Sequence, residues 1–221
     1  MLLKQNIEYI LEAKKVALSD FLTKNDVNSV EEFSVEQLQE IGKHYEVNLK
    51  DLLFSDLKMR ANHLKNIKLL ILDVDGVMTD GGMYFTEAGD QFKKYNTKDG
   101  MAIIHLTKKD FQVGIISSGF KTEMVKARAD LLGIQHFYVG RGKKIDVLNN
   151  WCEELNISLS EVAMIGDDIN DLEVMQAIGV SACPNDAVEK IKNTARIILN
   201  KKGGEGCVRE FIDNYLLPEP V

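Results

Sequence analysis

Two carboxylates, Asp73 and Asp75, stand at the end of a short apolar run, residues 67–72, and are followed by Gly76. A short apolar run bounded by a turn signal predicts a buried strand, and side chains at i and i+2 of extended backbone point the same way. Both acids can therefore face one site. Because neighbouring carboxylates repel each other, we expect a cation or a shared proton between them. The glycine permits a sharp turn and a close approach by a ligand.

An isolated Asp-Gly pair is also a common turn, so the hypothesis of a site depends on matching groups elsewhere in the chain. Such groups occur at the ends of later strand-like segments: Ser117, Lys144, and Asp167 with Asp171. Each alone has a structural explanation as a strand-ending serine, a solvated lysine or a turn. In a parallel sheet, however, the carboxyl ends of the strands meet at one edge, so these side chains are predicted to converge.

The converging groups suit the hydrolysis of a phosphate monoester. A carboxylate can attack phosphorus to give an acyl-phosphate that water then opens, which divides one difficult step into two. Asp75 can protonate the leaving alkoxide and then deprotonate the attacking water. Ser117 can donate hydrogen bonds to phosphoryl oxygens, and Lys144 supplies a fixed positive charge to the nucleophile and the phosphate.

A dianionic phosphate facing carboxylates also needs a cation. Mg²⁺ prefers oxygen ligands and keeps several of its waters. Asp73 and Asp167 are its expected ligands, and the carbonyl of Asp75 completes the protein's share. Asp171, four residues after Asp167, is expected to orient Lys144 or the waters on the metal.

Strand-like and helical segments alternate after residue 66, which predicts an α/β fold with a doubly wound parallel sheet. A β-hairpin is expected over residues 81–95, a polar loop over 96–100 and a flexible glycine-rich loop over 203–206. The later strands are expected at 112–117, 136–139, 162–165, 180–183 and 196–199. The helices are expected at 101–110, 121–132, 143–155, 169–178, from 186, and 207–217.

Residues 1–65 form a different unit, because their apolar residues recur at helical spacing. Ser34 is expected to cap a helix with Gln37 in the capping-box position. This extension resembles the later helices of a helix-turn-helix regulator, but its charge is mixed and slightly acidic, which disfavours DNA binding. A role in packing or oligomerisation is favoured. The expected division is therefore 1–65 for the helical extension and 66–221 for the α/β domain.

The composition is that of an ordinary globular protein, with 45% hydrophobic and 28% charged residues among 221. A formal net charge of −7 argues against a general binder of nucleic acids or anionic membranes. The three cysteines are scattered, which indicates reduced thiols and a cytoplasmic protein. Neither a signal peptide nor an apolar stretch long enough for a membrane span is evident.

The stretch Asp-Val-Asp-Gly-Val-Met-Thr-Asp, residues 73–80, resembles the first motif of the haloacid dehalogenase superfamily. The remaining groups resemble its other three motifs one by one. The resemblance implies that Asp73 is the nucleophile of a magnesium-dependent phosphatase. It also favours Lys144 over Lys143 as the motif lysine, because Ile145 and Leu148 follow with the family's spacing.

Residues 66 to about 217 resemble the capless branch that contains the 3-deoxy-D-manno-octulosonate 8-phosphate phosphatases and related nonulosonate 9-phosphate phosphatases. Residues 72–82, 98–100 and 203–210 carry this resemblance. It implies a sugar-acid phosphate as substrate and a homotetramer in which hairpins and glycine-containing tails of neighbouring subunits close the site. The implied substrate-binding residues are Lys98, Asp99, Ser118, Gly119, Glu205 and Arg209. For Arg209, an ordinary surface charge is an equal alternative.

The chain departs from this branch at Ser118-Gly119-Phe120, where the family often has Thr-Gly-Arg. The loss of a cationic side chain weakens assignment to the octulosonate phosphate, and residues 169–173 resemble the nonulosonate-associated members more. Three alternatives stay open: a catalytically weak tetramerisation or scaffold module of acylneuraminate metabolism, a DNA-associated regulator, and a phosphomutase. The intact motifs disfavour the first, and the missing lid disfavours the last.

Overall fold

The computed structural model describes residues 2–119 and 121–216. The chain divides into two compact units, Met1–Asn62 and His63–Val221, against a division at 65/66 expected from the sequence. Phe120 and Leu217, the latter the expected end of the last helix, lie outside the described residues. The two units are described separately below.

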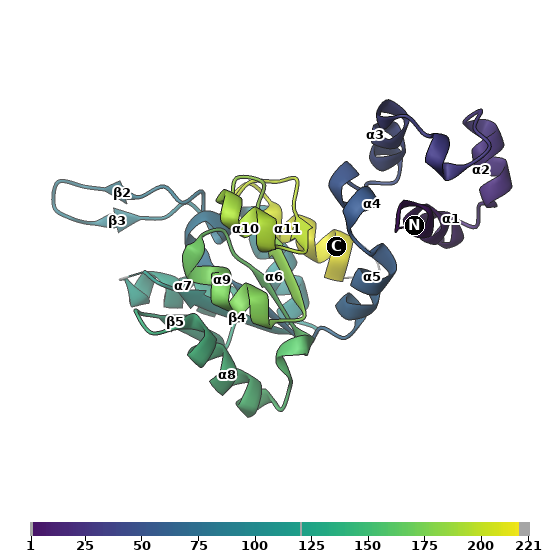
Figure 1. Cartoon of the computed structure of the whole chain (residues 1–221). Coiled ribbons are helices and arrows are strands. Elements are labelled where there is room, and N and C mark those ends of the chain that lie inside the picture. Colours follow the sequence, from purple (N-terminus) through teal and green to yellow (C-terminus); the bar gives the residue numbers. More distant parts are fainter. Residues whose placement is uncertain (1, 120, 217–221) are drawn as a thin grey trace. The chain divides into compact units, whose positions relative to one another are not determined.

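The second unit is built on a six-stranded parallel sheet of order β5-β4-β1-β6-β7-β8 (Figure 1). The strands are β1 Leu69–Leu72, β4 Gln112–Ser117, β5 His136–Val139, β6 Val162–Ile165, β7 Val180–Cys183 and β8 Ile197–Ile198. Leu72, the last residue of β1, pairs with Ile115 of β4 and with Ile165 of β6. The three central strands therefore end at nearly the same level, and the loops that follow them meet at one edge. The doubly wound α/β fold is confirmed.

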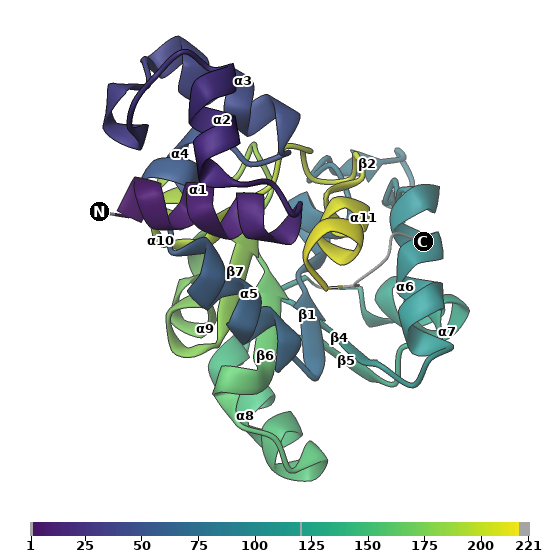
Figure 2. The ribbon, with the colours of Figure 1, turned by 90° about the vertical axis from the view of Figure 1, so that its right-hand side faces the viewer.

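Helices cover both faces of the sheet (Figure 2). They are α6 Thr97–Thr107, α7 Thr122–Leu132, α8 Lys144–Leu155, α9 Leu172–Ala177, α10 Glu189–Thr194 and α11 Cys207–Phe211, which continues as a π-helical turn over Ile212–Leu216. Side chains alternate along β1, so Leu70 and Leu72 pack against α6, α7 and α11, whereas Leu69 and Ile71 pack against α8, α9 and α10. A strand that is buried on both faces has a continuous run of apolar residues in its sequence, and β1 has such a run.

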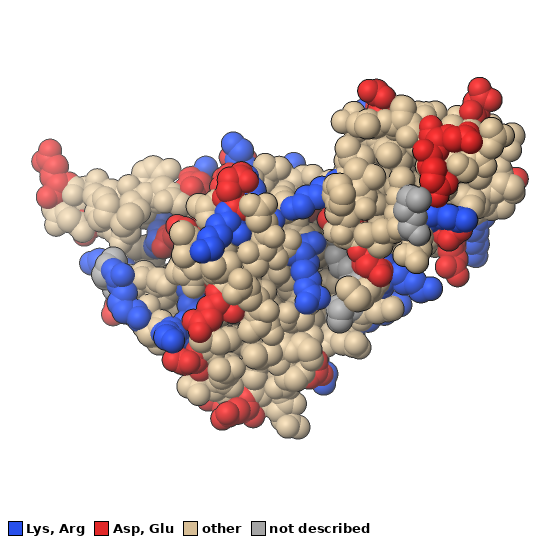
Figure 3. Space-filling model, in the orientation of Figure 1, with Lys and Arg blue, Asp and Glu red and all other residues tan. Residues whose placement is uncertain are grey.

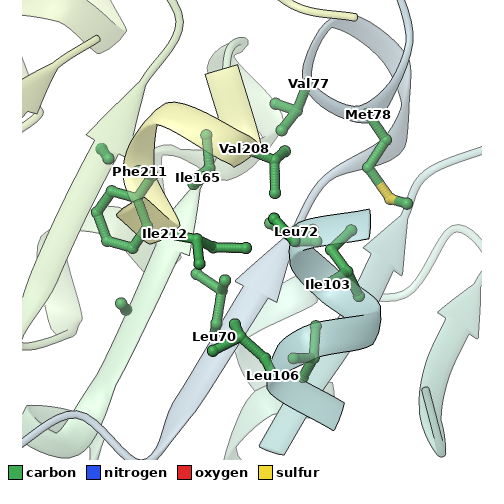
Figure 4. Packing of buried hydrophobic residues seen from close by; sticks show 14 of the residues in the cluster. Leu70, Leu72, Val77, Met78, Ile103, Leu106, Ile165, Val208, Phe211 and Ile212 are labelled. Atoms are coloured by element: carbon green, nitrogen blue, oxygen red, sulfur yellow. The ribbon is translucent and has the colours of Figure 1, made fainter. Parts of the chain in front are cut away.

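Helix α11 fills one of these two cores. Its Val208 and Phe211 lie beside Leu72 and Ile165 of the central strands, and beside Val77 of the turn after β1 (Figure 4). All five side chains are fully buried. The C-terminal helix is thus part of the support beneath the loop that carries Asp73 and Asp75.

A two-stranded hairpin, β2 Tyr84–Phe85 and β3 Gln91–Phe92, follows the first motif and extends away from the sheet (Figure 1). The expected hairpin is therefore confirmed. Its arms expose large apolar side chains: Met83 is 57% exposed, Tyr84 48%, Phe85 62% and Phe92 56%. Because Tyr84 pairs with Phe92 and Phe85 with Gln91, apolar side chains are exposed on both faces of the hairpin.

The first unit contains α1 Leu2–Ala13, α2 Leu18–Lys24, α3 Val35–His44 and α4 Leu49–Phe54, and the boundary to the second unit falls within α5 Leu57–Lys65. It has a hydrophobic core of its own, to which Ile7, Leu11 and Leu52 contribute fully buried side chains. The capping box expected at Ser34 is present: its side chain accepts a hydrogen bond from the backbone N–H of Gln37. The extension is therefore an independently packed helical unit.

Three expectations about local structure were wrong. Residues 97–100 are the first turn of α6 and not a loop, because the Asn96 side chain accepts a hydrogen bond from the Lys98 N–H and caps the helix there. The segment after β6 is a 3₁₀ turn, Ile169–Asp171, before α9 begins at Leu172, and α10 begins at Glu189 and not at 186. The glycine-rich loop 203–206, expected to be flexible, is a turn whose three glycines are buried.

Candidate active site

The first motif is a tight turn, Val74–Met78, that starts directly after Asp73. The Asp73 N–H donates to the Ile165 carbonyl, which ties the start of the turn to the end of β6. Gly76 has a φ of +91°, a conformation that side chains with a Cβ rarely adopt. A Cβ there would also lie 2.1 Å from Oδ2 of Asp167. Only glycine at this position lets the first and fourth motifs approach each other.

Lys144, the first residue of α8, holds two carboxylates from different loops. Its Nζ lies 2.5 Å from Oδ1 of Asp73 and 2.6 Å from Oδ1 of Asp171, and all three side chains are buried. Burial lowers the pKa of the Lys144 ammonium, but Asp73 and Asp171 outweigh this and raise it overall, so the group stays charged. Lys143 is exposed and precedes the helix as its N-cap residue.

Asp73, Asp167 and Asp171 offer carboxylate oxygens that lie within 4.8 Å of one another. Burial, together with repulsion from Asp171, raises the pKa of Asp73 to about 7. Burial, together with repulsion from Asp73 and Asp171, raises the pKa of Asp167 to about 8. Among the described residues, Oδ1 of Asp167 is buried with no hydrogen-bond partner. A hard divalent cation fits this arrangement, because it would neutralise the excess charge and bind the unpartnered oxygen.

Asp171 also shapes the loop around this cluster. Its Oδ2 accepts a hydrogen bond of 2.9 Å from the Asp167 N–H, and a Cβ on Gly166 would lie 2.7 Å from the Asp171 side chain. Asp171 is therefore both a partner of Lys144 and the residue that fixes the fourth motif. The sequence assigned it to an orienting role; the structure also brings it within the carboxylate cluster.

Asp73 and Asp167 of this cluster line a cavity of about 320 Å³. Ser117, Ser118 and Gly119 line one wall, with the Ser117 Oγ accepting a hydrogen bond from the Gly119 N–H at 3.1 Å. The other lining residues are Asp73, Asp75, Met83, Gln91, Lys93, Lys121, Val125, Arg141, Asp167, Asp168 and Asn170. Three of the four motifs therefore line one cavity, and the hairpin supplies part of its wall. Lys144 is not a lining residue and reaches the site through its ion pair with Asp73.

Lys93, on the hairpin just after β3, is a cavity residue that sequence reasoning missed. Its Nζ forms an ion pair with Oδ1 of Asp75, and its side chain is only 6% exposed. Lys121, Arg141 and Asn170 are also lining residues without a distinctive local signal. A signal for Lys93 does exist: side chains alternate along a hairpin arm, so Gln91 and Lys93 point the same way, opposite to Phe92.

Four residues expected to bind substrate do not line this cavity. Lys98 and Glu205 are exposed. The carboxylate of Asp99 is buried and accepts the Arg209 N–H at 2.7 Å, and the Arg209 side chain donates from Nε to Asp213 at 2.5 Å. Within one chain, Asp99 and Arg209 therefore connect α6 to α11. Ser118 and Gly119 do line the cavity.

Comparison with known proteins identifies sequence relatives of this chain. The profile of the haloacid dehalogenase-like hydrolases matches residues 140–212. The 3-deoxy-D-manno-octulosonate 8-phosphate phosphatase KdsC of Escherichia coli K12 is 39% identical over 155 residues, which cover 70% of this chain and 82% of that protein. KdsC of Yersinia pestis is also 39% identical, over 154 residues.

Solved structures agree with the sequence relatives. The octulosonate 8-phosphate phosphatase of Yersinia pestis superposes with a TM-score of 0.68 at 37% identity and covers 70% of this chain and 83% of its own. That of Moraxella catarrhalis, solved with magnesium, phosphate and KDO, gives a TM-score of 0.69 at 31% identity and covers 72% and 91%. The chain therefore belongs to the haloacid dehalogenase-like hydrolases, in the family that includes the 3-deoxy-D-manno-octulosonate 8-phosphate phosphatases.

Proposed function

We propose that the protein is a magnesium-dependent phosphatase that hydrolyses a 3-deoxy-2-ulosonate phosphate through an aspartyl-phosphate. The observation that carries this proposal is the placement of Lys144 between Asp73 and Asp171, whose carboxylates lie within 4.8 Å of that of Asp167. The nucleophilic carboxylate of Asp73, the Lys144 ammonium that offsets its charge, and the cation site are thus adjacent to one another. Asp73, Asp167 and the carbonyl of Asp75 would hold the ion, with Asp171 behind them.

Asp73 attacks phosphorus from the cavity floor, and the bond to the sugar oxygen breaks. Lys144 holds the Asp73 carboxylate in place and offsets its charge against that of the phosphate. Ser117 donates a hydrogen bond from its hydroxyl group to a phosphoryl oxygen. Mg²⁺ held by Asp73 and Asp167 would supply positive charge to the phosphoryl oxygens. The product of this half-reaction is an acyl-phosphate on Asp73.

Asp75 carries the protons. It protonates the leaving sugar oxygen, then takes a proton from the water that opens the acyl-phosphate and so regenerates Asp73. Lys93 is paired with Asp75 and gives this acid a fixed position on the cavity wall. The Lys93 ammonium also lies on the cavity wall, where its positive charge favours binding of the entering dianion.

The substrate proposal comes from the relatives named above and from the lining of the cavity. Lys121 and Arg141 supply cationic side chains on the wall, which suit an acid with a second anionic group. Both the octulosonate 8-phosphate and the nonulosonate 9-phosphates have this chemistry. Phe120, where the family often has arginine, lies outside the described residues, and residues 169–173 favour the nonulosonate phosphates.

We also infer a homotetramer in the cytoplasm. The exposed apolar side chains of the hairpin support assembly, because an isolated subunit would leave the cross-strand pair Tyr84 and Phe92 in water. Lys98 and Glu205, which are exposed, would then act at a neighbour's site, and Asp99 and Arg209 would act through the loop that they hold. Reduced thiols fit the cytoplasm, and all three cysteines are buried. No helix in the described part of the chain is long and apolar enough to cross a membrane.

Nucleic acid is not a proposed ligand. Lys and Arg side chains are interspersed with Asp and Glu on the visible face of the second unit, without a continuous basic surface (Figure 3). The acidic net charge of −7 agrees with this reading. The role we assign to the helical extension is packing or oligomerisation.

Phosphate release from a substrate panel tests the proposal. The purified chain with Mg²⁺ is expected to hydrolyse KDO-8-phosphate or a nonulosonate 9-phosphate with a higher kcat/KM than p-nitrophenyl phosphate, and Asp73→Asn is expected to abolish all turnover. A folded protein that releases no phosphate from any sugar phosphate would instead support the scaffold alternative. Sedimentation of the intact chain tests the tetramer separately.

A further inference from the structure

The glycine loop, residues 203–206, packs backbone against backbone on the turn of the first motif. The Gly204 N–H donates to the Val77 carbonyl at 2.9 Å. A Cβ on Gly203 would lie 1.9 Å from the Gly76 carbonyl oxygen, and one on Gly204 would lie 2.4 Å from the Asp80 nitrogen. No side chain separates the two segments. Any shift of the glycine loop therefore moves the backbone that directly follows Asp75.

Asn96 ties the glycine loop to the start of α6. Its Nδ2 donates to the Gly204 carbonyl at 3.1 Å, while its Oδ1 accepts the Lys98 N–H at 2.8 Å. One amide side chain thus caps a helix with its oxygen and holds the loop with its nitrogen. The Arg128 guanidinium, from α7, donates to the Asn96 carbonyl at 3.4 Å and adds a third element to the junction.

A second contact anchors the far end of the same loop. Asp99, one turn into α6, accepts the Arg209 N–H with Oδ1 at 2.7 Å, so its carboxylate caps the first turn of α11. Asp99 is only 2% exposed. The stretch from Gly204 to Arg209 is therefore held at both ends by residues of one short segment, 96–99.

We propose that Asn96 is a positioning residue that, together with Asp99, holds the glycine loop against the first-motif turn and so sets the place of the Asp75 carboxyl group. The proposal rests on the proton-transfer role that the proposed function gives to Asp75. It assigns Asn96 no contact with substrate. Its chain of contacts runs from the amide nitrogen of Asn96 through Gly204 and Val77 to the turn.

Leaving-group dependence separates this role from simple loss of stability. A sugar alkoxide needs a proton as it departs, whereas p-nitrophenolate leaves without one. Displacing Asp75 therefore lowers kcat/KM for a sugar phosphate far more than for p-nitrophenyl phosphate. A variant that is only less stable loses the same fraction of active enzyme toward both substrates.

Two substitutions separate the role of the Asn96 amide nitrogen from that of its oxygen, which caps α6. Asn96→Asp and Asn96→Ser both keep an oxygen that can cap α6, but neither can donate from a side-chain nitrogen to Gly204. Thr107→Val is the matched control: it removes the 2.8 Å hydrogen bond from Thr107 Oγ1 to the Leu132 carbonyl at the other end of α6. Asp75→Asn sets the scale of the effect.

We expect both Asn96 variants to lose at least tenfold more kcat/KM on the sugar phosphate than on p-nitrophenyl phosphate. The measurements are made at saturating Mg²⁺, and the circular dichroism spectra should be unchanged. Thr107→Val should lower the two values by one common factor. If Asp75→Asn shows the selective loss and the Asn96 variants do not, the positioning role is wrong. If Asp75→Asn itself shows no selective loss, the proposed role of Asp75 fails, and the proposal for Asn96 fails with it.

Discussion

Lys144 and Asp73 are joined by an ion pair in which Nζ lies 2.5 Å from Oδ1, although 71 positions separate them in the sequence. The pair is buried, and Asp171 shares the same ammonium group. A buried charge that loses its partner is costly, so neither side of this arrangement tolerates removal of the cation. The neighbouring Lys143 has no such contact within the described residues.

Replacement of Lys144 by alanine should therefore cost both activity and stability. We expect kcat to fall by roughly 10²-fold or more, as for other preorganised electrostatic groups, and the free energy of unfolding to fall by about 3 kcal/mol. Lys143→Ala is the control and should change each by little. Phosphate-release kinetics and urea unfolding measure the two effects. Equal behaviour of the two variants would contradict the assignment of the motif lysine.

Asp73→Asn should abolish turnover yet stabilise the metal-free protein. The folded-state pKa of about 7 lies above the ordinary value of 3.8, so the folded chain keeps a proton that the unfolded chain loses between those pH values. Wild-type stability from this group is therefore present below pH 4 and lost as the pH rises through 7. The variant lacks this loss, and its advantage in the free energy of unfolding should grow over that window to an amount on the order of 4 kcal/mol. Urea unfolding in EDTA at several pH values tests this, and a constant difference would refute it.

Magnesium should stabilise the wild-type chain through Asp167. Ligand that binds only the folded state raises the melting temperature with its concentration, and millimolar Mg²⁺ is expected to raise it by several degrees. Asp167→Asn should remove most of this shift, because it removes a negative charge and one carboxylate oxygen from the cluster. Asp168→Asn, next in the chain but outside the cluster, should keep it. Thermal unfolding with and without EDTA distinguishes the two, and equal shifts would argue against the cation site.

Gly203→Ala should disrupt the first motif through the contact between the glycine loop and the first-motif turn. The added methyl group would lie 1.9 Å from the Gly76 carbonyl, a rigid backbone atom that must move. We expect a loss of about 3 kcal/mol in stability and a tenfold or larger loss of kcat. Gly89→Ala, in the hairpin turn with a φ of +87° and open space around it, should cost only about 1 kcal/mol with little loss of activity. A Gly203 variant that behaves like the Gly89 variant would show that the contact is not needed.

The fold and the floor of the site could be predicted because they depend on local patterns. Continuous apolar runs such as β1 identify strands buried on both faces, and parallel strands bring their carboxyl ends together wherever the intervening helices lie. Asp73, Ser117 and Asp167 each stand at such an end. Their convergence follows from topology and needs no knowledge of side-chain contacts.

The supporting contacts could not be predicted in the same way. Asp99 caps a helix that begins 108 positions later, and nothing near Asp99 in the sequence indicates that partner. Glycine in a run such as 203–206 suggests freedom, but here the missing side chains serve a close approach to the first-motif turn. The start of α6 did have a local signal, an asparagine able to cap it, which the polar composition of the segment concealed.

The thiol of Cys207 donates to the same Val77 carbonyl that the glycine loop contacts, and it is fully buried. Burial raises the pKa of this thiol, so its reactive thiolate is scarce in the native fold. An alkylating reagent can modify it only during the brief moments when α11 lifts away. The alkylation rate of Cys207 therefore reports how often this junction opens. Slower labelling in the presence of saturating product would measure how strongly a bound ligand stabilises the closed state.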